Sequence, residues 1–216
     1  MQDCLIERTE RIVVAFDMRS STKILENLSE KGNEAKFLDL WDELAEVIRE
    51  RSTHDTRSGH IVLHQIDFIP SKFTGDGWLL IFPLDTEPLQ IIRLLHQISL
   101  TFASRFLSII QPVLTASVTS GLRFGMDCGP LLRYPMLGKK EYAGVPLNKA
   151  TRLQDAARAF TSTTGDRLLA SAQCWARKLA GIGGLEKYQP LRIPLDLGET
   201  KTSDGAGPFL LTLPPS

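Results

Sequence analysis

Apolar positions along the chain recur with two spacings, which predict an alternation of strands and helices. Residues 11–16, RIVVAF, form a β-branched run that is typical of a buried strand. Serine and threonine at positions 20–22 follow as candidate N-caps of a helix that ends near Ser29. A second helix is predicted over residues 33–51, because apolar side chains there are spaced by three and four. These side chains are Phe37, Leu40, Trp41, Leu44, Val47 and Ile48.

The middle of the chain predicts a strand hairpin followed by a long helix. The polar segment 52–60, STHDTRSGH, indicates a loop. Strands are predicted over residues 61–74 and 78–82, on either side of a Gly-Asp-Gly turn. A helix over residues 87–110 follows, and Pro112 ends it. Polar residues interrupt this apolar stretch and make it amphipathic rather than membrane-spanning: Arg93, His96, Gln97, Arg105 and Gln111.

The remaining elements complete an α+β pattern. A strand pair begins near residue 116, a helix is predicted over residues 145–160, and short strands with one helix fill the C-terminal third. A polar glycine-rich loop precedes a closing strand, FLLTL. The order strand, helix pair, hairpin, helix, strand predicts a ferredoxin-like βαββαβ core with additional C-terminal strands and a helix. We expect one domain over residues 1–216, with its core motifs in residues 11–160.

Composition narrows the class of protein. Lys plus Arg and Asp plus Glu both number 25, so the formal net charge is zero, which argues against general nucleic-acid binding. Three widely spaced cysteines, Cys4, Cys128 and Cys174, suggest neither a disulfide framework nor a zinc site. Charges in the first residues interrupt any signal-peptide core. We therefore expect a cytoplasmic protein that binds neither nucleic acid nor membranes.

Two aspartates occupy positions where strands end. Asp17 directly follows the first strand, and Asp76 lies between Gly75 and Gly77 in the hairpin turn. In a βαββαβ sheet the first strand lies beside the hairpin, so both carboxylates can reach one edge of the sheet. Such a pair, with backbone carbonyls nearby, suits Mg²⁺ or Mn²⁺. The alternatives are a helix cap for Asp17 and a plain hairpin for Asp76.

The helix over residues 145–160 carries polar residues on one face. Asn148, Arg152 and Asp155 fall at positions i, i+4 and i+7. Arginine offers a planar, permanently charged fork for phosphate oxygens, and asparagine both donates and accepts hydrogen bonds. The alternative is a solvated polar face. The packed side would be formed by Ala150, Leu153, Ala157 and Phe160.

Four segments, in order, resemble the motifs of the class III nucleotide cyclase domain. VVAFDMRSST resembles the first metal-aspartate motif, and KFTGDGWLLIF resembles the Lys-x-x-Gly-Asp hairpin. LRFGMDCGPLL resembles the Arg-x-Gly-x-x-x-Gly strand, and YAGVPLNKATRL resembles the Gly-x-x-x-Asn-x-x-x-Arg helix start. Each motif is weak alone, but the four occur in the family's order, and the resemblance extends over roughly residues 11–160.

This resemblance implies an activity and roles for individual residues. Asp17 and Asp76 would bind two divalent cations, Mn²⁺ or Mg²⁺, with help from the Met18 carbonyl. Asn148 would orient the ribose, and Arg152 would stabilise charge on the α-phosphate. A cation for the β- and γ-phosphates is expected late in the chain. Lys201 is the candidate and Arg192 the reserve, although the family's lysine-glycine pair is absent there.

The resemblance also implies an assembly. In this family the active site lies at a head-to-tail dimer interface, where one subunit supplies the metal aspartates. The other subunit supplies the base-reading residues, the asparagine and the arginine. Because this chain carries both sets, a symmetric homodimer with two sites is implied, and a monomer is expected to be nearly inactive.

The identity of the base stays open at the level of hydrogen bonding. Lys72 and Glu141 occupy the base-reading positions, and a donor beside an acceptor fits several bases. If the bulky Phe73, Trp78 or Tyr142 leaned into the pocket, they would narrow it toward a pyrimidine; the alternative is that they pack in the core.

A short chain without sensor modules resembles the pyrimidine nucleotide cyclases of bacterial Pycsar antiphage systems. Their cyclic UMP or cyclic CMP activates a separate effector. We expect UTP as substrate ahead of CTP. One alternative is a soluble adenylate cyclase that makes cyclic AMP. The other is an inactive domain that only binds nucleotides or dimerises as a regulator.

Overall fold

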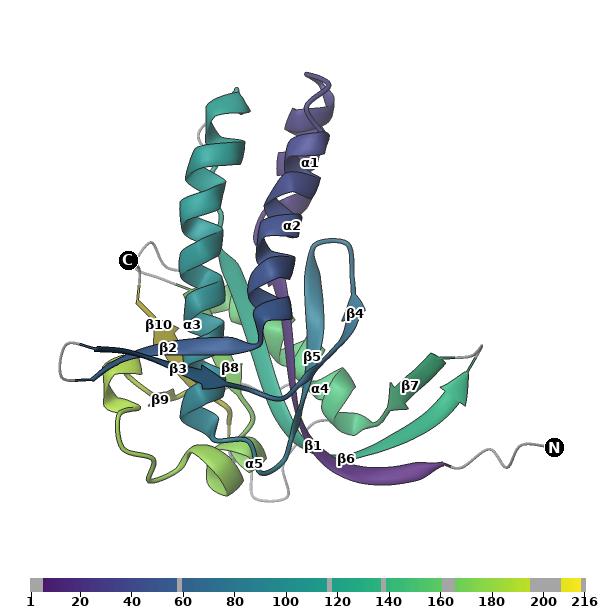
Figure 1. Ribbon diagram of the computed structural model, residues 1–216, viewed down its shortest axis with the longest axis vertical. Helices are drawn as coiled ribbons and strands as arrows, with labels where there is room; N and C mark the ends of the chain where they lie inside the picture. The colour runs from purple at the N-terminus through teal and green to yellow at the C-terminus, as the bar shows by residue number, and fades with distance from the viewer. Residues whose placement is uncertain are drawn as a thin grey trace.

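A mixed β-sheet forms the centre of the molecule in the computed structural model (Figure 1). The structure describes residues 6–57, 60–115, 118–136, 139–160, 166–194 and 207–214, with backbone alone for residues 52–57 and 60–64. Neighbouring strands of the sheet are antiparallel except β6 and β8, which are parallel. In spatial order the strands are β4 (Ile69–Phe73), β5 (Gly77–Pro83), β1 (Glu7–Met18), β6 (Leu122–Met136), β8 (Asp166–Ala170), β10 (Phe209–Leu213) and β9 (Leu191–Arg192).

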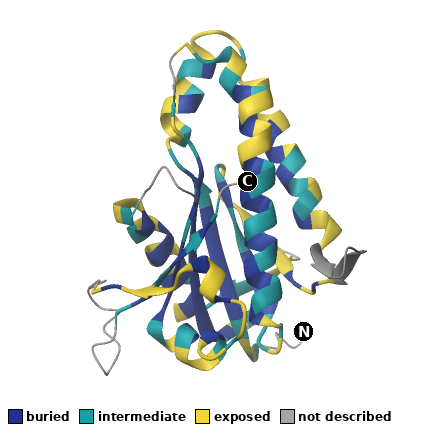
Figure 2. Ribbon diagram, turned by 90° about the vertical axis from the view of Figure 1, so that its left-hand side faces the viewer, coloured by how far each residue is buried: buried dark blue, intermediate teal, exposed yellow. Residues whose placement is uncertain are grey.

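Alternation along β1 separates two cores. Ile12, Val14 and Phe16 belong to a large buried cluster that contains helices α1 (Ser21–Ser29), α2 (Ala35–Glu50) and α3 (Pro88–Arg105). Val13 and Ala15 face the opposite side, where Ala150 of helix α4 (Val145–Ala156) packs against them. Figure 2 shows the buried central strands with the long helices along one side. The helices thus cover both faces, and β1 runs between them.

Helix α4 lies directly on β6. A Cβ atom at Gly125 would come within 2.0 Å of the Ala150 carbonyl oxygen, so only glycine allows this approach. The predicted packed side of the helix is confirmed, because Ala150, Leu153 and Ala157 are fully buried. The helix is thereby fixed relative to the strand that neighbours β1.

The class predicted from the sequence, α+β with a βαββαβ core and C-terminal additions, is confirmed. Helix α3 continues through a π-helical turn (Phe106–Ile110) into a 3₁₀ turn (Gln111–Val113), and the helical region ends there beside Pro112. Strand β7 (Lys139–Ala143) pairs with the end of β6 and forms a hairpin arm (Figure 1). The C-terminal additions also include α5 (Ala172–Cys174), a π-helical turn (Trp175–Leu179) and a 3₁₀ turn (Glu186–Tyr188).

Two sequence predictions are wrong. Residues 52–60 are not a loop, because β2 (Ser52–Arg57) and β3 (His60–Gln65) pair as a separate two-stranded ribbon. The predicted strand 61–74 is divided into β3 and β4, since the chain between them enters the core at Ile66 and Phe68. The sequence of β2, STHDTR, is polar throughout, so no apolar alternation marks it as a strand.

The N-cap of α1 lies at Ser20, one of the three predicted candidates, but it lacks the expected side-chain hydrogen bond. Ser20 has a left-handed φ of 61°. Neighbouring Ser21 directs its hydroxyl elsewhere, to Asp76. No helix among the described residues has the length and apolarity needed to cross a membrane.

Candidate active site

Asp17 and Asp76 meet at one corner of the sheet, as the sequence predicted. Asp17 pairs with Gly77 across β1 and β5, and the Met18 amide donates to the Asp76 carbonyl oxygen at 2.8 Å. A Cβ atom at Gly77 would lie 1.8 Å from the carbonyl oxygen of Phe16, so glycine is required for this close approach. The turn and the strand end are therefore held together by backbone contacts.

Hydrogen bonds fix both carboxylates. The hydroxyl of Ser21 donates to Oδ2 of Asp76 at 2.6 Å. Arg123 stands directly opposite Asp17 across β1 and β6, and its Nε donates to Oδ1 of Asp17 at 2.9 Å. A second guanidinium nitrogen of Arg123 donates to Oδ2 of Asp17, which makes the pair bidentate. Arg123 belongs to the quoted Arg-x-Gly strand motif, but the sequence assigned it no role.

Burial raises the pKa of Asp17 to about 6. Arg123 acts in the opposite direction, and the negative charges of Asp76 and Asp155 raise the pKa further. Because desolvation and carboxylate repulsion both oppose its ionisation, Asp17 gains from a nearby cation.

The two aspartates line a cavity of about 710 Å³. The segment from Met18 to Lys23, which joins the end of β1 to the first turn of α1, forms one wall, and several cationic side chains surround the cavity. Arg19 is anchored there by the Asp166 carboxylate at 3.4 Å and by the Ser120 carbonyl oxygen at 3.2 Å. The lining residues are Asp17, Met18, Arg19, Ser20, Ser21, Thr22, Lys23, Asp76, Thr119, Arg123 and Arg158.

The donor set fits a hard divalent cation. Two carboxylates and the Met18 backbone lie at the cavity, and Mg²⁺ or Mn²⁺ completes such a shell with water and phosphate oxygens. Among the described residues there is no group of three or more His, Cys, Asp or Glu side chains that could hold a metal. The protein would therefore bind cations here only with help from a substrate or water.

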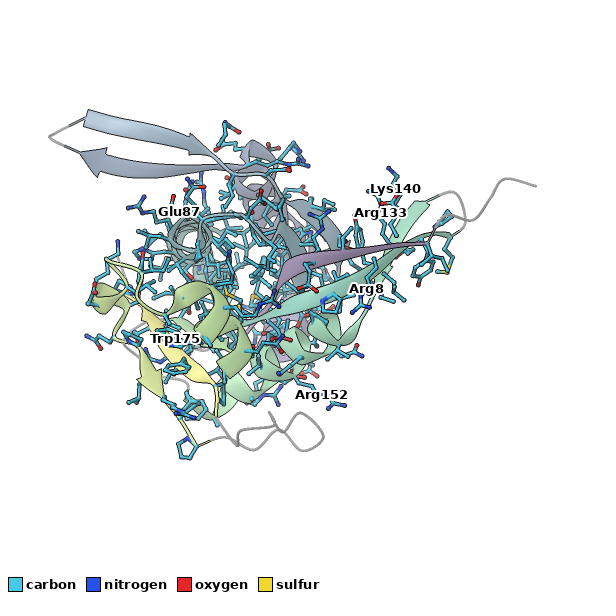
Figure 3. The ribbon with its side chains drawn as sticks, turned by 90° about the horizontal axis from the view of Figure 1, so that it is seen from below. Arg8, Glu87, Arg133, Lys140, Arg152 and Trp175 are labelled. Atoms are coloured by element: carbon cyan, nitrogen blue, oxygen red, sulfur yellow. The ribbon has the colours of Figure 1, made fainter. Side chains whose placement is uncertain are left out.

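Asn148 and Arg152 lie outside this cavity. Both side chains are exposed on α4, and neither belongs to its lining. Figure 3 shows Arg152 on the outer side of the helix, away from the sheet. One chain therefore does not bring Asn148 and Arg152 to the two aspartates.

The two proposed base-reading residues, Lys72 and Glu141, lie on different strands and apart from each other. Lys72 pairs with Leu79 across β4 and β5, and Leu79 packs on the α4 side of the sheet. Glu141 is half-buried on β7, which is attached to β6, so β5, β1 and β6 separate the two residues. Neither residue lines the cavity of Asp17 and Asp76.

Two of the three bulky neighbours face away from Lys72. The rings of Phe73 and Trp78 are 4.6 Å apart, and Trp41 of α2 packs against both of them. This aromatic group lies on the α2 side of the sheet, so it does not narrow a pocket on the α4 side. Tyr142, in contrast, packs beside the α4 core.

Of the two expected phosphate-binding cations, the structure describes only Arg192. Lys201 lies outside the described residues. Arg192 is exposed on β9, at the sheet edge opposite β4, and it does not line the cavity. The structure instead brings Arg123 and Arg158 there. Arg123 would have been recognisable from the register of β1 with β6, whereas no sequence signal marked Arg158.

The chain matches neither a protein-family model nor a curated protein sequence, but its fold has many solved counterparts. A bacterial light-regulated adenylyl cyclase aligns over 97% of this chain at 13% identity, with a TM-score of 0.65. The chain spans 52% of that protein's length.

Two further structures align over nearly their whole length. The adenylyl cyclase CyaB from P. aeruginosa matches 96% of both chains at 14% identity, with a TM-score of 0.64. The guanylyl cyclase Cya2 matches 95% of this chain and 91% of its own, at 14% identity and a TM-score of 0.59. This chain therefore has the α+β fold of class III nucleotide cyclase domains.

Proposed function

We propose that the protein is a nucleotide cyclase, which converts a nucleoside triphosphate to a 3′,5′-cyclic nucleotide and pyrophosphate. The observation that carries the proposal is the convergence of Asp17 and Asp76 in one cavity whose walls also carry arginine. Carboxylates that hold divalent cations beside guanidinium groups match the needs of phosphoryl transfer.

The chemistry forms one bond and breaks another. The 3′-oxygen of the ribose attacks the α-phosphorus, the bond to the bridging oxygen breaks, pyrophosphate leaves, and the hydroxyl proton passes to water. Divalent cations, when bound, lower the pKa of the attacking hydroxyl and neutralise the phosphates. Asp17 and Asp76 hold them, with the Met18 carbonyl contributing, and Ser21 keeps the Asp76 carboxylate oriented.

Arg123 has two positions in this scheme. In the structure, its guanidinium donates to both oxygens of Asp17. If those oxygens held a cation, the guanidinium would be free to interact with the phosphates in the same cavity. This exchange keeps the buried Asp17 carboxylate paired at each stage, which avoids the cost of an unpaired buried charge.

A head-to-tail homodimer would complete the site. Asn148 and Arg152 are exposed and outside the cavity of their own chain. In the proposed dimer they orient the ribose and stabilise the α-phosphate in the partner's cavity, so two equivalent sites form. Lys72 and Glu141 would read the base from the same interface.

For the base we propose a pyrimidine, UTP ahead of CTP, with the cyclic product acting on a separate effector in antiphage defence. Of the three bulky neighbours, Tyr142 is the one on the α4 side of the sheet, so a narrow pocket would depend on this residue. ATP is the second candidate. It is favoured by the position of Phe73 and Trp78, because these side chains pack on Trp41 and leave the base pocket on the α4 side open to a larger base.

A binding-only role is the candidate from another class. It is favoured by Arg123, which already engages both oxygens of Asp17 and competes with a cation. A regulator of this kind would bind nucleotide and release no cyclic product.

The deciding experiment incubates purified protein with equal ATP, GTP, CTP and UTP plus Mn²⁺, and separates products by mass. Cyclic UMP or cyclic CMP as the main product supports the pyrimidine proposal, and cyclic AMP supports the second candidate. Nucleotide binding without any cyclic product identifies the regulator. The Asp76→Asn protein is the matched control, because it keeps the side-chain shape and removes the charge.

A further inference from the structure

Four cationic side chains line the cavity, and two of them are already engaged. Arg19 is paired with Asp166, and Arg123 is paired with Asp17. Lys23 and Arg158 have no hydrogen bond or ion pair among the described residues. Of these two, Arg158 has the planar fork that binds two phosphate oxygens at once.

The backbone of Arg158 is held firmly at the cavity. It belongs to the 3₁₀ turn Ala157–Phe160, which directly follows α4. Ala157 is fully buried, and Phe160 packs against the same core cluster. The Nε atom of Arg167 donates to the Phe160 carbonyl oxygen at 3.1 Å, which ties the end of the turn to β8. Because the backbone of this turn is already ordered, binding through Arg158 costs little backbone conformational entropy.

Charge balance favours further cationic side chains beside the phosphates. A nucleoside triphosphate brings about four negative charges, and Asp17 and Asp76 bring two more, while two divalent cations cancel four of these. Two negative charges remain. Arg123, once released from Asp17, neutralises one of them, and Arg19 is unavailable because Asp166 already neutralises it. Arg152 of the second chain is assigned to the α-phosphate, so Lys23 and Arg158 are the cavity cations that remain for the β- and γ-phosphates, and only Arg158 carries a guanidinium fork.

We propose that Arg158 binds the β- and γ-phosphates of the substrate in the same chain that supplies Asp17 and Asp76. The proposal rests on the proposed cyclase function and names a residue for the cationic position that Lys201 was expected to fill. The proposal assigns two arginines of one helical region to different active sites of the dimer. Arg152 serves the partner's site, and Arg158, six residues later, serves its own.

The first experiment measures binding without chemistry. Inorganic tripolyphosphate with Mn²⁺ is titrated into the wild-type, Arg158→Ala and Arg158→Lys proteins by calorimetry. We expect Arg158→Ala to bind at least about 10-fold more weakly, and lysine to restore part of the loss, because it keeps the charge without the fork. The control is Arg49→Ala, which removes an exposed arginine of α2 that is paired with Glu46.

Wild-type affinity in Arg158→Ala would overturn the proposal. This readout does not depend on turnover. If the wild-type protein makes no cyclic product but Arg158→Ala still loses tripolyphosphate affinity, the cyclase proposal fails and the Arg158 assignment stands.

The second experiment decides which chain's site Arg158 serves. Inactive Asp17→Ala protein is mixed with an equal amount of Arg152→Ala protein, and subunits are allowed to exchange. Half of the dimers are then mixed, and each contains one intact site, so about a quarter of wild-type activity should return. Asp17→Ala mixed with Arg158→Ala should give no recovery, since the only site with metal ligands lacks Arg158.

Recovery in both mixtures would place Arg158 in the partner's half-site and overturn the assignment. Substrate is kept below the wild-type KM, because a lost phosphate contact raises KM more than it lowers kcat. Matching thermal melting curves for Arg158→Ala, Arg158→Lys and wild type exclude misfolding as the cause.

Discussion

The aspartate corner and the exposed face of α4 are built in opposite ways. At the corner, Asp17 is held by Arg123, Asp76 is held by Ser21, and the backbone is locked at Gly77. On α4, Asn148 and Arg152 are exposed and have no hydrogen bond or ion pair among the described residues. One region is organised within a single chain, whereas in the proposed dimer the other would be organised only when a second chain covers it.

The two regions differ in how far their charged groups are removed from water in the folded chain. The corner is buried enough to raise the pKa of Asp17, so its charges have been taken from water during folding. The polar face of α4 keeps its solvation until a substrate or a second chain arrives. Substitutions at the corner should therefore change both activity and stability, whereas substitutions on the α4 face should change activity alone.

The largest effect should come from Asp76→Ala. Loss of a metal ligand should lower the rate of cyclic product formation by at least about 1000-fold, because bound cations supply several kcal/mol of transition-state stabilisation. The fold should lose only about 1 kcal/mol, since Asp76 accepts a single side-chain bond, from Ser21. The checks are product analysis by mass and chemical denaturation. Asp85→Ala, at an exposed aspartate two residues beyond β5, is the control and should be neutral. Unchanged product formation in Asp76→Ala would remove the metal assignment.

Arg152→Ala should give the next largest effect and leave the corner intact. We expect a loss of about 100- to 1000-fold in kcat, as for other removed donors to developing charge. Mn²⁺ binding, measured by electron paramagnetic resonance, and the melting temperature should not change, because Arg152 touches neither Asp17 nor Asp76. A drop in Mn²⁺ affinity would mean that α4 and the corner act within one chain.

Gly77→Ala should damage the corner through its backbone. The added Cβ atom meets the Phe16 carbonyl oxygen at 1.8 Å, so β1 and β5 must move apart. We expect the free energy of unfolding to fall by about 1–3 kcal/mol, together with a loss of activity. Gly183→Ala is the matched control, since nothing lies within 4 Å of its Cβ position, and it should stay within about 0.5 kcal/mol of wild type. Equal stability of the two variants would show that the strands separate without cost.

The sequence predicted the corner better than its surroundings, for physical reasons. Asp17 and Asp76 follow from strand order alone, because the first strand of a βαββαβ sheet lies beside the hairpin. Arg123 needed the register of β1 with β6, which depends on packing across the whole sheet. Arg158 lies beyond the regular spacing of α4, in a turn that no motif marked.

The position of Phe73 was predictable from strand alternation. Lys72 and Phe73 are neighbours in one strand, so their side chains face opposite sides of the sheet. If Lys72 reads a base on the α4 side, Phe73 cannot narrow the same pocket. Trp78 follows its cross-strand partner Phe73 to the α2 side. Strand β2 was different, because its sequence, STHDTR, is polar throughout and gave no period to detect.

The smallest effect should come from a region remote from both, at His96 on α3. Its Nε2 lies 3.0 Å from the Pro214 carbonyl oxygen, and burial lowers the pKa of the imidazole, with a contribution from the charge of Lys187. Because the folded protein holds this proton more weakly than the unfolded chain, the neutral histidine is fully compatible with the fold above about pH 6.5. As the pH falls below that value, the unfolded chain takes up the proton first and stability declines. We expect His96→Gln to flatten this decline in urea unfolding between about pH 6.5 and pH 5, and to leave product formation at pH 7.5 unchanged. A pH profile identical to that of wild type would exclude His96 as its source.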